Sequence, residues 1–246
     1  MKTQIKKIIL LLTIPLTILT LLNATTQTFS NYQTTFQINS NSTIQINQSL
    51  TLKNTDTTGI NPDQIEFRIN KNTENGFENV KILEVQAKDN QDKTLKSQIF
   101  ENEQHQIIIL DIKKNLKPNQ EYNFQITYKF SYESEGILFK SLKIPITQSS
   151  IPIEKGTFTI QLPNKYHFTY TQNNNQTPQI LGKTATWQIQ NNNPNSIGIE
   201  YSYIPIKIAN FKGSYIFWII INIIILIFLA FEIKREIEII RQEENE

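Results

Sequence analysis

The sequence predicts an all-β ectodomain, made of antiparallel β-sandwich modules, with an N-terminal signal peptide and one C-terminal transmembrane helix. Two observations lead to this fold class. Apolar segments stand near both ends of the chain, at Ile8–Leu22 and at Tyr215–Phe231. Between them, apolar and polar residues alternate with period two, and no helix pattern of useful length interrupts the alternation.

The clearest strand covers Tyr122–Tyr132, where aromatic and aliphatic side chains occupy every second position. Successive side chains of a strand point to opposite faces, so this pattern predicts a half-buried strand. The same alternation recurs in five further segments, at residues 44–52, 65–69, 158–162, 185–189 and 197–203. Ile107–Leu110 is apolar at every position, which predicts a central strand covered on both faces.

We expect two β-sandwich modules, over residues 25–134 and 135–210, the second being the smaller. The boundary is placed at the charged turn Ser134–Gly136, which follows the longest predicted strand. Clusters of Asn, Asp, Gly and Pro separate the other strands, as at Lys117–Gln120. A single continuous sandwich is the alternative.

Residues 1–24 are predicted to be a signal peptide. Lysines precede the apolar run Ile8–Leu22, whose length is typical of secretory signals. Ala24 offers a small residue for cleavage, although Leu22 is bulky for the position two before it. Without cleavage the segment would remain as a signal anchor, and the middle of the chain would still be translocated.

The uncharged run Tyr215–Phe231 predicts a transmembrane helix over residues 214–232. Lys234 and Arg235 follow it, and the positive-inside rule places them in the cytoplasm. We therefore expect a type I protein of the cell membrane, or of the endoplasmic reticulum membrane in a eukaryote. Residues 25–213 would be extracytoplasmic, and residues 233–246 would form a short charged helical tail in the cytoplasm.

Asn222 is the polar side chain within the predicted span. An amide in lipid favours a hydrogen-bonding partner, so Asn222 is a candidate contact to a second copy or to another subunit. The alternative is a lone, tolerated asparagine.

Composition excludes several classes of function. The 246 residues include 24 basic and 22 acidic side chains and no cysteine. A near-neutral balance disfavours nucleic-acid binding. Without cysteine the ectodomain has no disulfides, no thiol nucleophile and no Cys-ligated zinc site.

We predict no enzymatic activity, no cofactor and no metal site. His105 and His167 lie in strand-like contexts, and the chain has no G-x-S-x-G motif. Glu101, Glu103 and Asp111 flank one predicted hairpin and leave open a carboxylate-based hydrolase. The segment Asp89–Asp92 lacks the residue spacing of a calcium-binding loop, and its composition indicates a turn.

Candidate glycosylation sites are Asn41, Asn47 and Asn175, each two residues before Ser or Thr. Asn47 falls on the polar face of its predicted strand. Asparagine-rich turns at Asn173–Pro178 and Asn191–Asn195 flank the same pair of strands. They form the candidate binding surface, with plain solvated loops as the alternative.

Residues Val85–Phe130 resemble the first luminal β-module of ribophorin I, a non-catalytic subunit of oligosaccharyltransferase. The shared order is a strand, a polar hairpin, and a proline followed by a small loop and an alternating strand. The same stretch, with Leu162–Thr171 and Thr184–Gln190, is similar to membrane-anchored β-sandwiches that precede transglutaminase-like domains. Lacking cysteine, this chain has no transglutaminase Cys-His-Asp set, and no functional residue is carried over.

Three hypotheses follow from these observations. The first is a non-enzymatic, single-pass membrane protein whose ectodomain binds a protein or glycan partner. The second is an accessory, ribophorin-like subunit of a membrane enzyme complex, held through the transmembrane helix. The third is a hydrolase built on the carboxylates named above.

Overall fold

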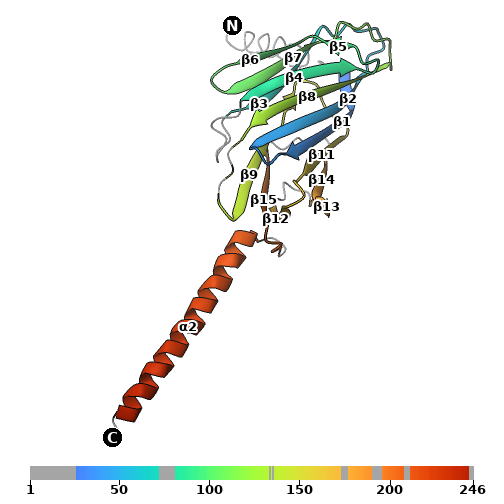
Figure 1. Cartoon of the computed structure of the whole chain (residues 1–246). Coiled ribbons are helices and arrows are strands. Elements are labelled where there is room, and N and C mark those ends of the chain that lie inside the picture. The colour runs from blue at the N-terminus through green and yellow to red at the C-terminus, as the bar shows by residue number, and fades with distance from the viewer. Residues whose placement is uncertain are drawn as a thin grey trace, which may run out of the picture.

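The computed structural model describes residues 26–71, 81–132, 134, 136–172, 177–189, 196–207 and 211–243. It consists of a β-sandwich from which one long helix, α2 (Gly213–Glu243), extends (Figure 1). Within the described residues, α2 is the helix that is long and apolar enough to cross a membrane. The most apolar 18 residues of its candidate span, Gly213–Gln242, are not buried against the rest of the chain. The predicted signal peptide lies outside the described residues.

The first layer is an eight-stranded sheet with the order β13-β14-β11-β1-β2-β8-β4-β5. Its strands are β1 (Gln27–Ile38), β2 (Thr43–Asn54), β4 (Ile82–Asp89), β5 (Thr94–Leu95), β8 (Glu121–Ser131), β11 (Gly156–Gln161), β13 (Gln179–Leu181) and β14 (Thr184–Ile189). Burial alternates along β2 and β8 because one face of the sheet packs inward, as the period-two pattern predicted. The fold class is therefore confirmed: an all-β sandwich with one C-terminal apolar helix.

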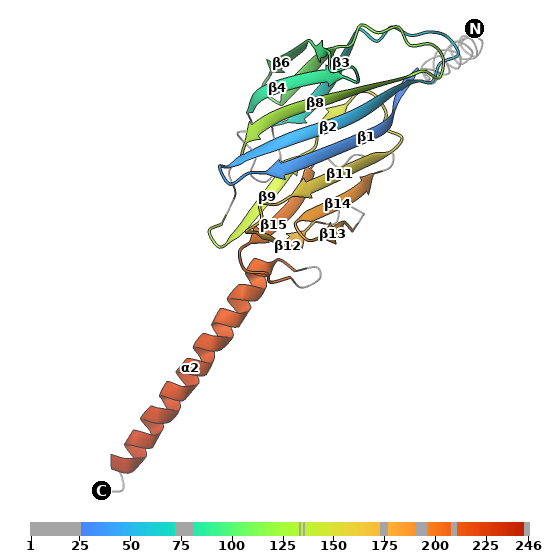
Figure 2. The ribbon, with the colours of Figure 1, turned by 45° about the vertical axis from the view of Figure 1, so that its right-hand side comes forward.

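The second layer consists of two smaller sheets (Figure 2). One has the order β10-β3-β7-β6, with β3 (Gln64–Asn70), β6 (Ser97–Glu101), β7 (His105–Asp111) and β10 (Gln148–Ser149). The other has the order β12-β15-β9, with β9 (Phe139–Pro145), β12 (His167–Thr171) and β15 (Ser196–Ser202). The chain passes from one to the other through the buried residues Ile146 and Thr147.

The eight-stranded sheet takes strands from both sides of the boundary predicted near residue 134. β1 and β11 form a parallel pair in register from Tyr32↔Gly156 to Gln37↔Gln161, whereas the other strand pairings are antiparallel. One hydrophobic cluster also runs through both halves, from Phe29 to Tyr201. This arrangement favours the single continuous sandwich over two separate modules.

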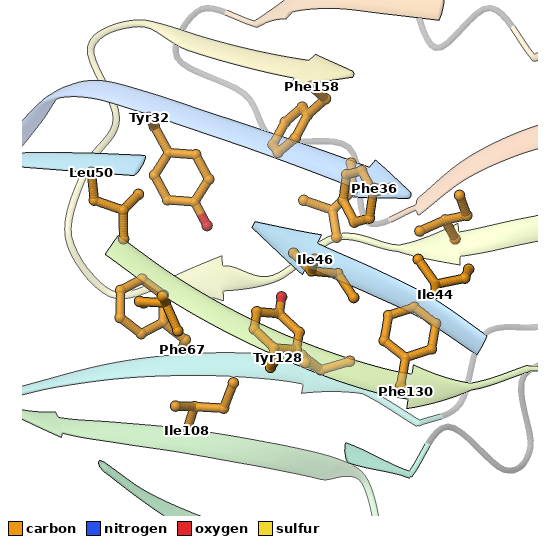
Figure 3. Close-up of a cluster of buried hydrophobic side chains, with 14 of the residues drawn as sticks. Tyr32, Phe36, Ile44, Ile46, Leu50, Phe67, Ile108, Tyr128, Phe130 and Phe158 are labelled. Carbon is orange, nitrogen blue, oxygen red and sulfur yellow. The ribbon is translucent and has the colours of Figure 1, made fainter. Parts of the chain in front are cut away.

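Aromatic rings fill the space between the layers (Figure 3). The ring of Phe29 on β1 lies 6.2 Å from that of Phe67 on β3, and Phe158 packs against Tyr32 and Phe36. All five side chains are at most 1% exposed. Burying an aromatic or aliphatic side chain of this size stabilises the fold by about 1.5–3 kcal/mol, so this cluster is the main source of stability.

A small polar network lies inside this core. The Tyr32 hydroxyl donates to the Thr147 carbonyl oxygen at 3.3 Å and accepts from Gln48 Nε2 at 3.1 Å. The Tyr128 hydroxyl pairs with the Thr147 hydroxyl. Burial raises the pKa of both tyrosines well above the ordinary value of 10.0. The network holds Thr147, in the segment that joins the two smaller sheets, against β1 and β8 of the large sheet.

The prediction for Ile107–Leu110 is only partly correct. These residues belong to β7, which lies between β3 and β6 in its sheet. Ile108 and Leu110 are fully buried, but Ile107 and Ile109 are half-buried. The outer face of this sheet is not fully covered by the described residues, because the second layer is the last layer of the sandwich.

Candidate binding groove and helix junction

An open groove of about 690 Å³ lies where the parallel strands β1 and β11 end. After Gln37 and Gln161, which are partners in the register, the two strands separate. β1 turns within the sheet into β2, whereas the chain after β11 leaves for β12 in the other layer. Adjacent parallel strands whose connections leave in different directions produce a crevice at their carboxyl ends, where many α/β proteins bind ligands.

Three turns form the walls of the groove. They are residues 37–41 between β1 and β2, residues 161–164 after β11, and residues 183–184 between β13 and β14. Backbone hydrogen bonds hold them: Asn39 N–H donates to Thr43 O at 2.8 Å, and Leu162 N–H donates to Lys183 O at 2.9 Å. The Lys183 ammonium donates to the Tyr166 carbonyl oxygen. The walls are therefore fixed by the ends of the strands.

The lining of the groove is mostly amide and hydroxyl groups. It contains the side chains Gln37, Asn39, Ser40, Asn41, Gln161, Asn164 and Thr184, together with Lys183, Ile38, Leu162 and Pro163. Each amide supplies two N–H donors and one carbonyl acceptor. Such a lining can bind an uncharged ligand that carries many hydroxyl groups.

The junction between the sandwich and α2 is built around Glu200 of β15, a carboxylate that is 1% exposed. The Glu200 carboxylate accepts hydrogen bonds from the Ser214 backbone N–H at 3.1 Å and from the Ser214 hydroxyl at 2.5 Å. It also accepts one from the Thr169 hydroxyl at 2.7 Å. A carboxylate at a helix N-terminus binds free N–H groups and is favoured by the helix dipole. Glu200 thus attaches the start of α2 to the sheet.

Close packing completes this junction. A Cβ atom on Gly213 would lie 2.7 Å from both the Thr169 Cβ and the Ile206 carbonyl oxygen. The Phe139 ring of β9 lies 5.5 Å from the Phe217 ring of α2. Among the described residues, the helix therefore meets the sandwich through Gly213, the Glu200 carboxylate and the ring pair of Phe139 and Phe217.

Lysines and tyrosines gather at the same end of the molecule. The Tyr166 ring lies 4.4 Å from Tyr203 and 5.1 Å from Tyr201. Lys140 and Lys165 lie over the Tyr166 ring at 5.6 and 5.4 Å. Hydrogen bonds from Tyr166 and Lys165 lower the pKa of Tyr203, and the Tyr203 hydroxyl raises the pKa of Lys165. The cluster holds positive charge at an aromatic surface.

The carboxylates considered for a hydrolase do not form a pair. In the β6–β7 register Glu101 faces Gln106 at one end of β7, whereas Asp111 lies at the other end. Five residues of strand separate those ends by roughly 17 Å, beyond the separation of about 5–9.5 Å between glycosidase carboxylates. Glu101 pairs instead with Lys71, whose ammonium lowers the pKa of that carboxyl, and Glu103 lies in the adjoining turn.

The histidines and the candidate calcium segment also lie apart. His105 is in β7 and His167 in β12, which belong to different sheets. Asp89 Oδ1 accepts from the backbone N–H groups of Gln91 and Lys93, as expected of a turn. Among the residues that the structure describes, no three His, Cys, Asp or Glu side chains could hold a metal ion together.

The glycosylation candidates have different surroundings. Asn41 lies in the exposed β1–β2 turn, and its Oδ1 accepts from the Thr43 hydroxyl at 2.7 Å. Asn47 lies on the outer face of β2, where its Oδ1 accepts from Thr127 at 3.1 Å. Asn175 lies outside the described residues. Glycosylation stays a prediction at all three.

Asn222 is exposed on α2 and donates from Nδ2 to the Trp218 carbonyl oxygen at 2.8 Å. This bond within the helix satisfies one of its two N–H groups, so the contact with a partner helix stays a prediction. Of the asparagine-rich turns, residues 173–176 and 191–195 lie outside the described part of the chain. The groove lies at the other end of β13 and β14, at the turn that joins them.

Sequence reasoning did not identify the groove or the role of Glu200. The groove draws on three turns that are distant in sequence and become neighbours through the β1–β11 pairing. Glu200 stands in an alternating strand, where a carboxylate ordinarily faces solvent. The sequence does show polar turns at the groove and an acid at position 200. The spacing of these residues, however, does not indicate that the turns meet or that the acid is buried.

No protein-family model and no curated protein matches the chain. Among solved structures, a candidate nutrient-binding protein from Legionella pneumophila has 7% identity and a TM-score of 0.41, covering 72% of this chain and 67% of the other. An M1 zinc metallopeptidase from Deinococcus radiodurans has 10% identity and a TM-score of 0.36, covering 72% of this chain and 42% of that enzyme. With TM-scores this low, these likenesses carry no argument about function, and the resemblance to ribophorin I stays a prediction.

Proposed function

We propose that this chain is a single-pass membrane protein whose extracytoplasmic sandwich binds a glycan in the groove at the ends of β1 and β11, without performing chemistry on it. The carrying observation is the amide and hydroxyl lining of that groove. Sugars present hydroxyl groups that both donate and accept, and Asn and Gln side chains match them in both roles. The groove volume lies within the range of small-ligand sites.

The apolar helix supports the membrane part of the proposal. α2 carries exposed large aliphatic and aromatic side chains along its length, which water disfavours and lipid accommodates. Lys234 and Arg235 near its end favour a cytoplasmic C-terminus. The sandwich would then lie outside the cytoplasm, in the cell membrane or, in a eukaryote, the endoplasmic reticulum membrane.

The absence of chemistry is supported by the inventory of reactive groups. The chain has no thiol. Its two histidines lie in different sheets, and Glu101 and Asp111 lie at opposite ends of one strand.

Binding of oligosaccharides by the full chain in detergent micelles tests the proposal. The groove variant combines Gln37→Ala with Asn164→Ala, which remove exposed amides from two walls. The control combines Gln86→Ala with Gln125→Ala, which remove exposed amides from the outer face of the sheet. Each lost hydrogen bond is worth about 0.5–1.5 kcal/mol, so the groove variant should bind roughly tenfold more weakly and the control unchanged. Failure of the wild type to bind any oligosaccharide, or equal binding by the groove variant, would contradict the proposal.

A further inference from the structure

The end of the β12-β15-β9 sheet beside α2 is defined by the register. Phe139, Ser202 and His167 face one another there, at the start of β9, the end of β15 and the start of β12. The Ser202 hydroxyl donates to the Leu138 carbonyl oxygen at 2.7 Å, which fixes the turn before β9. That turn lies beside the first turns of the helix (Figures 1 and 2). We call this end of the sandwich the helix-proximal end.

Large apolar side chains are exposed at the helix-proximal end. Ile137 is 90% exposed, and Leu138, Tyr203 and Phe211 are each about half exposed or more. Tyr215 and Trp218 continue this belt into α2. Tyrosine and tryptophan are enriched at the interface between lipid and water.

Charge is distributed unequally along the sequence of the sandwich. Residues 136–215 contain seven lysines but only two glutamates, whereas residues 26–135 contain 14 acidic and 11 basic residues. Glu200 is buried in hydrogen bonds, and Glu154 bonds to Thr28 of β1. Lys140, Lys143, Lys165, Lys207 and Lys212 belong to β9, to the residues just before β12 or to the residues that join β15 to α2, whereas the acid of those segments and of β15 is Glu200.

Four of these lysines lie close to the helix. Lys140 and Lys165 lie over Tyr166, and Lys212 lies over the Tyr215 ring at 5.9 Å. Lys207 is exposed in the connection that leads to α2. Contact with an aromatic face keeps an ammonium group at the surface that carries the ring.

We propose that the helix-proximal end of the sandwich binds the anionic phosphate headgroups of the outer leaflet through Lys140, Lys165, Lys207 and Lys212. The occupant follows from the helix itself. The apolar run begins at Tyr215, three residues after Lys212, so lipid headgroups must surround this end once α2 spans a bilayer. Lysines near an anionic leaflet are attracted to it within about one Debye length. The inference rests on the proposed membrane-spanning function of α2.

Quenching of tryptophan by brominated lipids tests this proposal on the full chain. Trp187 is buried in the sandwich, whereas Trp218 lies in the first turns of α2 and can meet lipid. The chain is reconstituted into vesicles of phosphatidylcholine and phosphatidylglycerol in equal amounts, with bromine on the acyl chains of one or the other. We expect quenching by brominated phosphatidylglycerol to exceed that by brominated phosphatidylcholine by roughly twofold, and the excess to fall at high salt.

Two variants complete the design. Replacing Lys140, Lys165, Lys207 and Lys212 by Gln should equalise quenching by the two lipids. Replacing Lys88, Lys93, Lys113 and Lys117, exposed lysines of the far end, should leave the excess unchanged. Equal quenching in the wild type, or an excess that survives in the first variant, would overturn the lipid proposal while leaving insertion established. No quenching by either lipid would mean that α2 has not entered the bilayer, which would overturn the proposed function as well.

Discussion

The interior of the sandwich and its junction with α2 are held together in different ways. In the interior, Phe29 alone meets three other rings, and the loss of any single contact leaves many others. At the junction, Glu200, Gly213 and the ring pair of Phe139 and Phe217 make the contacts. The comparison teaches that stability is distributed over many side chains, whereas the orientation of the helix depends on a few.

The largest effect is expected from Phe29→Ala. Removing a fully buried ring leaves a cavity, and such changes cost about 3–5 kcal/mol of unfolding free energy. Chemical unfolding of the chain in detergent, followed by Trp187 fluorescence, measures the loss. The control is Phe100→Ala on β6, where the ring is half exposed, and there we expect less than about 1 kcal/mol. Similar losses for the two variants would contradict the assignment of the interior as the main source of stability.

Glu200→Leu should affect the junction more than the interior. The leucine leaves the Thr169 hydroxyl and the Ser214 N–H without their acceptor. We expect a local loss of stability of about 3 kcal/mol. Hydrogen exchange at residues 213–217 should then be roughly a hundredfold faster. Mass spectrometry of exchanged peptides measures it. Glu200→Gln keeps one carbonyl acceptor and should lose less. Unchanged exchange in the leucine variant would show that the helix start is held by other contacts.

Gly213→Ala tests the close packing at the same place. The added methyl group would lie 2.7 Å from Thr169 Cβ and from the Ile206 carbonyl oxygen, so the backbone must shift, at a cost of about 2 kcal/mol. We expect faster exchange over residues 213–217 with little change in the unfolding of the sandwich. Gly182→Ala is not a suitable control because its φ is +60°. Gly59→Ala is suitable, because a Cβ there meets its neighbours at 3.5 Å or more.

A smaller effect concerns alkaline pH. Burial raises the pKa of Tyr32 above 10.0, so above pH 10 the unfolded tyrosine loses a proton that the folded one keeps. Stability contributed by this group is thus complete below pH 10 and is lost as pH rises. Tyr32→Phe should reduce the decline of the unfolding free energy between pH 10 and 11 by about 1 kcal/mol.

The alkaline prediction has an internal control. The pKa of Tyr203 is lowered, chiefly by the hydrogen bond from Tyr166. The folded Tyr203 therefore holds its proton less tightly than the unfolded one, in contrast to Tyr32. The unfolding free energy of Tyr203→Phe should decline with pH at least as steeply as that of the wild type. An unchanged slope in Tyr32→Phe would contradict the placement of that hydroxyl in the dry core.

The sequence predicted the strands more accurately than their arrangement. Residues 122–132 alternate strictly because β8 lies in the middle of a one-sided sheet, and period two is a local property. The parallel pairing of β1 with β11 joins residues that are distant in sequence, and no local pattern specifies it. The apolar residues Ile107 and Ile109 led to the prediction of a strand covered on both faces. An apolar side chain, however, does not by itself show that another layer covers it. The groove depends on the same distant pairing, so it could not be predicted either.

The parallel pair has a further consequence for how the protein is made. β1 emerges early during synthesis and can pair with β2 on one side as soon as residue 54 has appeared. Its other edge stays open until residues 156–161 have also been made, because β11 is the strand that covers it. An open, unpaired edge is a template for aggregation, and distant pairings form slowly. The nascent chain should therefore need protection at β1, and slowing synthesis before residue 156 should lower the yield of folded protein.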